Sequence, residues 1–188
     1  AAEVLKNKFD MPFVVSAPYG YAATLAWLEE VGKILGQLPD VKMCARLRLK
    51  AQNTASLKMY AMMMGRKKTP QIGEYDLVKG LSAFLRSVGI DVKYKLCSHS
   101  LKSIVEPELD IQYISVEKEK IDILKKMQKT LVLADDVSHR LCDSSNAVLR
   151  VSAPFIDGAQ IATHLPLLGE KGTDFLLETI EAYYQTLA

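Results

Sequence analysis

The hydrophobic pattern divides the chain into short apolar runs that alternate with amphipathic stretches. Apolar residues spaced at i, i+3 or i+4 and i+7 are typical of helices with one buried face. This spacing predicts helices over residues 2–9, 24–35, 39–64, 77–88, 117–129, 138–143 and 173–187, with a short helix or turn at 101–105. Apolar or alternating runs predict strands over residues 12–17, 90–96, 111–116, 131–134 and 147–152. Strands alternate with helices after residue 83, which predicts an α/β fold with parallel sheets flanked by helices.

The long predicted helix gives a natural boundary within the chain. Residues 1–64 are interpreted as a partial α/β unit that ends in this connecting helix, and residues 65–188 as a Rossmann-like α/β domain. Asp76, Asp135 and Thr173 stand at predicted helix starts, where their side chains are suited to cap the helix. The alternative for Asp135, together with its neighbour Asp136, is to face a ligand. Adjacent side chains point to different sides, so the two make a poor acid–base pair.

The tetrapeptide Val-Ser-Ala-Pro occurs twice, at residues 15–18 and 151–154, each time at the end of an apolar run. Tyr19 follows the first copy and Phe155 follows the second. In parallel α/β sheets, ligands bind outside the carboxyl ends of the strands, where such loops lie. The two loops are therefore candidate walls of a site, and the alternative is two ordinary strand exits that share four common residues. The irregular segment 154–168 is long for a connection in a compact domain, and such loops are usually functional.

Composition excludes several classes of protein. The 24 basic and 22 acidic residues give a formal net charge of +2, which provides no electrostatic case for binding nucleic acid. No apolar run has the ~18 residues of a membrane span, and residues 1–10 lack the apolar core of a signal peptide. Cys44, Cys97 and Cys142 are too widely spaced for a disulfide framework or a CxxC metal pair, which favours a cytoplasmic protein. The first residue is not methionine, as expected of a fragment or a trimmed chain.

Candidate chemistry is limited to a few residues. The sequence contains no GxGxxG, GxxxxGK[ST], HExxH or GxSxG motif, so a dinucleotide fingerprint is absent although the order of elements is Rossmann-like. The three histidines are candidates for acid–base groups, because imidazole titrates near neutrality. His99 and His139 follow predicted strands, and His164 lies in the long loop. The alternative for each is a partly exposed loop histidine with no catalytic role.

Three segments taken together resemble a known family. They are the block at 17–28, which begins Ala-Pro-Tyr-Gly-Tyr and continues to Trp27-Leu28, the Gly-Leu-Ser-Ala-Phe-Leu stretch at 80–85 with Gly89, and the block at 151–172. They are similar to the P-G-x-x-T-x-x-W-L block, the G-L-x-x-F-L-x-x-x-G helix and the carboxyl-terminal S-x-P … P-x-x-G-x-x-G block of nitrogenase component 1-like proteins. Their order and spacing agree over most of residues 12–187, so the chain resembles that superfamily.

The resemblance implies Rossmann-like domains around a substrate or cofactor cavity, in one subunit of a paired oxidoreductase. It implies a homologous partner subunit, in a homo- or hetero-dimer or tetramer, and electrons supplied by an ATP-dependent iron protein through an iron–sulfur cluster. The family's cluster cysteines belong to an amino-terminal domain. A cluster is therefore expected to be held by residues outside this chain or by a partner, and none of the three cysteines is assigned to it.

One part of the chain departs from the family pattern. The family has an apolar strand after the long helix, whereas this chain has Arg66-Lys67-Lys68 followed by Pro70. Proline and three cations make a poor central strand. The segment therefore predicts either an irregular edge of the sheet or a shortened chain.

A second departure separates the branches of the family. In nitrogenase itself, a histidine that ligates the metal cofactor precedes the G-x-x-G motif. Leu168 occupies that position here, and His164 lies four residues earlier, which disfavours dinitrogen reduction. The S-x-P and Ala-Pro-Tyr-Gly-Tyr blocks are more similar to those of the tetrapyrrole reductases, namely protochlorophyllide reductase, chlorophyllide reductase and the reductive cyclase of nickel-tetrapyrrole biosynthesis.

This branch implies ATP-driven reduction of a tetrapyrrole that is bound as a flat macrocycle between subunits. The alternatives are a non-enzymatic scaffold for assembly of a nitrogenase-type metal cofactor and a free-standing small-molecule binder. The candidate ligand-binding residues are Tyr19, Gly20, Tyr21, Thr24, Pro154 and Phe155. The aromatic ones are expected to form apolar walls, although aromatic side chains often only fill space, and the three histidines are expected to supply polar contacts or a proton.

Overall fold

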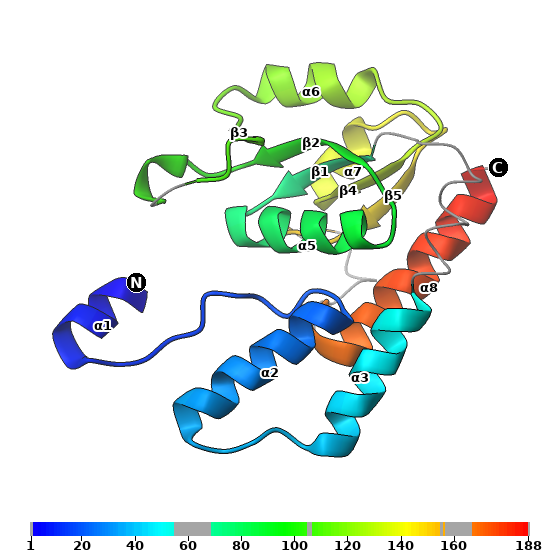
Figure 1. The fold of residues 1–188 in the computed structure, drawn as a ribbon. Helices are drawn as coiled ribbons and strands as arrows, with labels where there is room; N and C mark the ends of the chain where they lie inside the picture. Colours follow the sequence, from blue (N-terminus) through cyan, green and yellow to red (C-terminus); the bar gives the residue numbers. More distant parts are fainter. Residues whose placement is uncertain (1, 55–68, 105–106, 155, 157–166, 188) are drawn as a thin grey trace.

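The computed structural model describes residues 2–54, 69–104, 107–154, 156 and 167–187 (Figure 1). Its helices are α1 (Ala2–Phe9), α2 (Tyr21–Leu35), α3 (Val41–Asn53), α5 (Tyr75–Ser87), the 3-10 turn η1 (Leu101–Ser103), α6 (Glu117–Lys125), α7 (Asp136–Leu141) and α8 (Gly169–Leu187). Its strands are β1 (Thr69–Gly73), β2 (Val92–Cys97), β3 (Ile111–Tyr113), β4 (Leu131–Ala134) and β5 (Ala147–Arg150). In this described part of the chain, no helix combines the length and hydropathy needed to cross a bilayer.

The described strands form one parallel sheet in the order β3-β2-β1-β4-β5. Figure 1 shows α6 over one face of this sheet and α5 over the other. The predicted α/β class, with a parallel sheet flanked by helices, is therefore confirmed. The chain order reverses between β1 and β4, and this is the position at which doubly wound sheets usually bind their ligands.

Two hydrophobic clusters occupy the two faces of the sheet. On one face, Leu131 of β4 packs with Leu81 of α5 and Leu176 of α8, all of them fully buried. On the other face, Val132 packs with Leu124 of α6. Successive side chains of a strand point to opposite faces, so neighbouring residues of β4 serve both clusters. A strand buried on both faces reads as a continuous apolar run, which is why Leu131–Ala134 was predictable from the sequence.

A second layer is made only of helices. α2 and α3 pack against each other, and α2 also packs against α8, below the sheet in the view of Figure 1. The predicted strand at 12–17 is wrong, because this segment has no regular structure and no strand lies within 2–54 to pair with it. The proposed division at residue 64 stays a prediction, since residues 55–68 lie outside the described ranges.

The central strand of the sheet is β1, which contradicts the predicted irregular edge. All of Thr69–Gly73 is buried, and β1 pairs with β2 on one side and with β4 on the other. The register with β2 shifts between Thr69 and Pro70. Proline is accommodated at such irregularities because its missing N–H falls where the ladder is already interrupted. On the other side, β1 pairs with β4 at one position, where Gln71 lies opposite Leu133.

The helix starts differ from the sequence prediction in two places. α5 begins at Tyr75, so Asp76 lies in its first turn and does not cap it. α8 begins at Gly169, so Thr173 lies inside the helix, where its hydroxyl donates to the Gly169 carbonyl at 2.7 Å. The third predicted cap is confirmed, because the Asp135 carboxylate accepts from the Ser138 amide at 2.7 Å. α3 is the described part of the predicted helix at 39–64.

Candidate functional site

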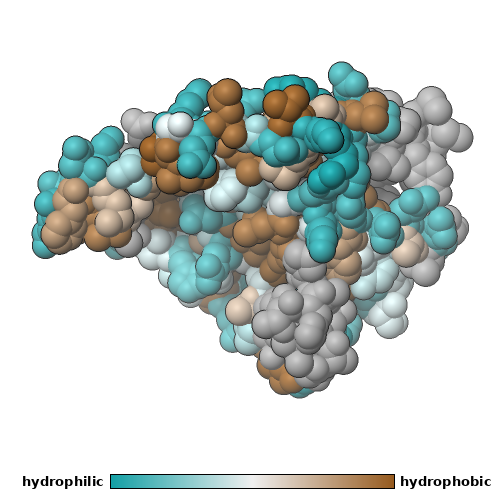
Figure 2. Space-filling model, turned by 90° about the horizontal axis from the view of Figure 1, so that it is seen from below, coloured by the Kyte–Doolittle hydropathy of each residue, from teal (hydrophilic) through white to brown (hydrophobic). Residues whose placement is uncertain are grey.

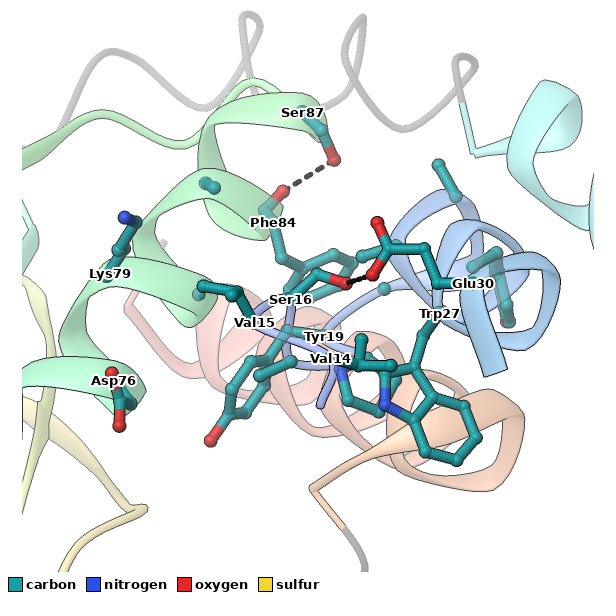
Figure 3. A pocket seen from close by; sticks show the side chains of 18 of the residues that line it. Val14, Val15, Ser16, Tyr19, Trp27, Glu30, Asp76, Lys79, Phe84 and Ser87 are labelled. Atoms are coloured by element: carbon teal, nitrogen blue, oxygen red, sulfur yellow. Dashed lines mark hydrogen bonds between the residues drawn. The ribbon is translucent and has the colours of Figure 1, made fainter. Parts of the chain in front are cut away.

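A cavity of about 1250 Å³ lies where the segment before α2 crosses α5. Its walls come from residues 13–23, from α2 and from the outer face of α5. Figure 3 shows mostly apolar and aromatic side chains around it, with Asp76 and Lys79 on one side and Glu30 on the other. Apolar surface is also exposed in the middle of the face seen in Figure 2. A concave, largely apolar site with a few polar groups is the usual form of a small-molecule site.

Two glycines allow the two segments that line the cavity to pack closely against each other. A Cβ atom at Gly80 of α5 would overlap the ring of Tyr19. A Cβ atom at Gly20 would lie 2.6 Å from Cδ2 of Phe84, and Gly20 also has φ +86°, a conformation that other residues rarely adopt. Each glycine thus accepts an aromatic ring from the other segment. Two of the sequence blocks that resemble the family, Tyr-Gly-Tyr and Gly-Leu-Ser-Ala-Phe-Leu, meet here in space.

Backbone and hydroxyl hydrogen bonds hold the Tyr19 loop in place. The Gly169 amide at the start of α8 donates to the Pro18 carbonyl at 2.9 Å. Thr24 donates its hydroxyl to the Gly20 carbonyl at 2.7 Å, within the first turn of α2. These hydrogen bonds join the residues before and after Tyr19 to two helices, so the backbone that carries the Tyr19 ring is held in place.

The Tyr21 hydroxyl points away from the ligand space and donates to Asp174 of α8. Burial of the ring and this hydrogen bond to Asp174 raise the pKa of Tyr21. Lys50 of α3 joins the same carboxylate at 2.8 Å and also lies 3.0 Å from Glu170. Arg46 adds a bidentate contact to Glu170, with Nη2 at 2.7 Å and Nε at 2.9 Å. This cluster ties α2 and α3 to the beginning of α8.

Acid is expected to weaken the α3–α8 connection. The hydrogen bond from Arg46 is the main cause that lowers the pKa of Glu170. A carboxyl group with a folded-state pKa below its unfolded value of about 4.3 stabilises the fold above that pH, and the contribution is lost as the pH falls through the folded pKa. We expect the melting temperature to decrease below about pH 4. Glu170→Gln should melt lower at pH 6 and depend less on pH in acid, whereas parallel pH profiles for the two proteins would contradict this role.

The charged groups of the cavity are mostly acidic. Glu30 accepts from the Ser16 hydroxyl at 3.0 Å, and Glu108 lies 3.8 Å from the Lys79 ammonium group. Asp76 is the third acidic residue that lines the cavity. Among the described lining residues, Lys79 is the only lysine or arginine. A carboxylate-bearing part of a ligand would therefore meet repulsion over most of the cavity, and neutral or hydrogen-bonding groups suit it better.

Three of the predicted ligand residues line this cavity, namely Tyr19, Gly20 and Tyr21. Thr24 does not line it, because its hydroxyl is used behind the loop in two hydrogen bonds to backbone carbonyls. Pro154 lies elsewhere, on the sheet side, where its carbonyl accepts from the Asp136 amide at 3.2 Å. Phe155 is outside the described residues. The two Val-Ser-Ala-Pro copies therefore do not both line the described cavity.

The second Val-Ser-Ala-Pro copy closes the point at which the strand order reverses. After β5 the chain passes over the end of β4, with the Val151 amide donating to the Ala134 carbonyl at 2.9 Å. The buried Ser152 hydroxyl then donates to the Ile72 carbonyl of β1 at 3.1 Å. A Cβ atom at Gly73 would lie 3.3 Å from the Ser152 Cβ, so the two backbones are close. The chain itself fills the crevice between β1 and β4.

The predicted histidines are not brought together at the cavity. His99 is exposed after β2, with Nδ1 at 3.1 Å from the Ser98 hydroxyl. His139 is half-buried in α7, with Nδ1 at 3.2 Å from Nη2 of Arg150. Neither residue is among those that line the cavity. His164 lies outside the described residues, and the catalytic role of all three stays a prediction.

The described residues do not fit an iron–sulfur cluster. Within them, no three histidine, cysteine, aspartate or glutamate side chains are grouped so as to hold a metal ion. Cys97 donates its thiol to the His99 carbonyl, Cys142 donates to the Ser138 carbonyl, and Cys44 is buried in α3. Burial, with a smaller contribution from Asp135, raises the pKa of Cys142 to about 11, which opposes the thiolate form that a metal requires.

Comparisons with known proteins agree with this architecture. The model of the nitrogenase component 1 type oxidoreductase family matches residues 1–184. The chain belongs to this family. One subunit of the light-independent protochlorophyllide reductase of Methylobacterium sp. (strain 4-46) is 26% identical over 196 residues, which cover 96% of this chain and 37% of that protein. A solved structure of nitrogenase Cp1 at pH 6.5 superposes with a TM-score of 0.74 and 17% identity over 98% of this chain and 42% of the other, which shows the shared fold.

This nitrogenase component 1 family chain thus spans less than half the length of both relatives. The predicted family membership is confirmed. The sequence prediction missed the α5 wall of the cavity, formed by Asp76, Lys79 and Gly80. A signal was present, because Gly80 interrupts a strongly amphipathic helix at a cost of about 1 kcal/mol relative to alanine and therefore indicates a packing reason.

Proposed function

We propose that this chain is part of a subunit of a nitrogenase-like oxidoreductase that reduces a tetrapyrrole, and that the macrocycle binds in the cavity between residues 13–23 and α5. The observation on which the proposal rests is the aromatic, largely apolar lining provided by Phe13, Tyr19, Trp27 and Phe84. Membership of the family and the similarity to a protochlorophyllide reductase support this choice of ligand.

The size and polarity of the cavity suit a flat conjugated ring. Small-molecule pockets commonly enclose roughly 300–1000 Å³, and the volume of about 1250 Å³ admits a ligand of this class. Apolar side chains on opposite walls would cover the faces of the ring and exclude water from it. The charged residues Asp76 and Lys79 lie on one side of the cavity, where ring substituents would be placed (Figure 3).

Other parts of the machinery lie beyond the described residues in this proposal. An ATP-dependent iron protein would supply electrons, and a cluster held by residues elsewhere or by a homologous partner subunit would pass them on. The role of this chain is to bind and orient the ring, keep water from it and present protonated groups at its edge. Tyr75, Asp76 and Lys79 are the titratable residues of α5 that line the cavity.

Trp27 provides a direct test, because it is the only tryptophan in the sequence and it lines the cavity. A tetrapyrrole bound there is expected to quench most of the Trp27 fluorescence and to shift its own main absorption band. Ala83→Tyr should weaken binding at least about tenfold, on the order of 1.4 kcal/mol, because Ala83 is an exposed lining residue of α5 and the new ring would fill the space.

The matched control for this titration is Ala182→Tyr. Ala182 is also an exposed helical alanine, but it lies in α8 and does not line the cavity. Its affinity for the ligand should equal that of the unmodified chain. Equal binding by both variants would place the ligand elsewhere, and absence of binding by the unmodified chain would contradict the proposed ligand.

A further inference from the structure

We propose that the Tyr19 hydroxyl is the hydrogen-bond donor that orients the ligand, and that its acceptor is a neutral carbonyl oxygen on the ring periphery. This inference rests on the proposed function and goes beyond it, because it assigns the residue that distinguishes one ring from another. It also changes the interpretation of Tyr19 from an apolar wall to a polar anchor.

The hydroxyl is available to a ligand. Tyr19 is half-buried, and within the described ranges no protein group donates to or accepts from its oxygen. Partly buried tyrosines usually find a partner for the hydroxyl. The other two tyrosines of the cavity have one, since Tyr21 donates to Asp174 and Tyr75 accepts from the Glu108 amide at 3.0 Å. Tyr19 is thus the lining tyrosine whose hydroxyl is left for a ligand.

The hydroxyl is also held in a fixed position. Gly80 leaves room for the Tyr19 ring to pack against α5, while Phe84 packs against Gly20 on the same loop. The Gly169 amide holds the Pro18 carbonyl immediately before the ring. A donor whose own ring is packed loses little conformational entropy when it binds a ligand, which favours selectivity.

The surroundings make the group a donor and select the kind of acceptor. Burial of the ring, with Asp76 and then Glu74, raises the pKa of Tyr19, so the phenol keeps its proton at neutral pH. Figure 3 shows the hydroxyl directed toward the side of the cavity where Asp76 lies. The same carboxylates that hold the proton on Tyr19 disfavour an anionic acceptor. A keto or acyl carbonyl oxygen accepts the hydrogen bond without that repulsion.

The experiment compares two rings of nearly equal shape. Mesoporphyrin dimethyl ester carries ethyl groups where diacetyldeuteroporphyrin dimethyl ester carries acetyl groups, and in both rings the esters remove the carboxylates that the acidic lining would repel. Dissociation constants are measured by absorbance for the unmodified chain, for Tyr19→Phe and for Tyr113→Phe, an exposed tyrosine of β3 that does not line the cavity. We expect Tyr19→Phe to weaken the acetyl ring about fivefold, as for loss of one hydrogen bond, and to leave the ethyl ring unchanged. Tyr113→Phe should change neither.

A spectroscopic measurement separates hydrogen bonding from packing. The acetyl carbonyl stretch of the bound ring should lie at lower frequency in the unmodified chain than in Tyr19→Phe. The melting temperature should stay the same, because the hydroxyl makes no hydrogen bond to protein within the described residues. Equal weakening of both rings, or loss of discrimination in Lys79→Met in place of Tyr19→Phe, would overturn the assignment. Failure of the unmodified chain to bind either ring would overturn the proposed function itself, and this inference with it.

Discussion

Replacing Arg150 with methionine is expected to destabilise the protein by about 3–5 kcal/mol, because it leaves a buried carboxylate without its cation. Nε of Arg150 lies 2.8 Å from Oδ1 of Asp136, and the two side chains are 17% and 1% exposed. The other oxygen of Asp136 accepts from the amide of Ile156, the second residue after the second Val-Ser-Ala-Pro copy. The pair therefore fixes the exit of β5 as well as the start of α7.

The test is urea unfolding of Arg150→Met, of Asp136→Asn and of the double variant. Removing both charges should recover part of the stability, because the main cost of each single change is the unpaired partner. Arg86→Met is the matched control. It removes an arginine whose side chain is 68% exposed and which lies 3.6 Å from Asp110, so only a small change is expected. A loss below about 1 kcal/mol in Arg150→Met would show that the carboxylate is not buried as described.

The second large effect concerns Gly80→Ala. Its effect on the free energy of unfolding should change sign when the Tyr19 ring is removed. Alanine there is expected to destabilise the fold by up to about 2 kcal/mol. Overpacking against the Tyr19 ring costs about 1–3 kcal/mol, and the better helix propensity of alanine offsets about 1 kcal/mol of this. In a Tyr19→Ala background the ring is gone, so the same Gly80→Ala change should stabilise by about 1 kcal/mol.

A double-mutant cycle measured by thermal or urea unfolding gives the coupling directly, and it should reach about 2–3 kcal/mol. Ligand titration followed through Trp27 should show weaker binding in Gly80→Ala, because the displaced Tyr19 ring moves toward the cavity. Additive effects of the two substitutions would mean that Tyr19 does not rest on Gly80. This cycle tests the architecture of the cavity independently of the identity of the ligand.

Much of the fold was predictable because α5 and α8 carry clear hydrophobic periodicity and β4 is a continuous apolar run. Two of the failed predictions share a physical cause, because a local sequence pattern does not report which strands pair. An apolar run reports burial and not the presence of a partner strand, so the run at Phe13 and Val14 predicts a strand although both residues line a cavity. Conversely, Pro70 argues against a central strand. The central strand tolerates it because the register with β2 shifts next to Pro70, and only the tertiary structure shows that shift.

For the site, local sequence identified one wall and missed the other. Tyr19 and Gly20 were predicted from the motif that contains them. The sequence pattern assigns Phe84 to the core stripe of its helix and Asp76 to a cap, because periodicity and capping rules describe one helix at a time. The contacts of Gly20 with Phe84 and of Tyr19 with Gly80 link segments about sixty residues apart, and nothing in either segment alone specifies the other.

The closure by Ser152 has a consequence for how this scaffold can be re-engineered. Doubly wound sheets usually bind ligands beyond the carboxyl ends of their central strands, so the loops at those ends are the natural place to introduce a new ligand. Here, the loop after β5 links the two halves of the sheet, because Ser152 joins the β4–β5 half to β1. The register between β1 and β4 is set at a single position, so this link matters for their pairing. A binding loop grafted there would remove this link and weaken the pairing of β1 with β4. The helix-lined cavity can be varied with less risk, because Ala83 and Lys79 project from α5 without entering the core.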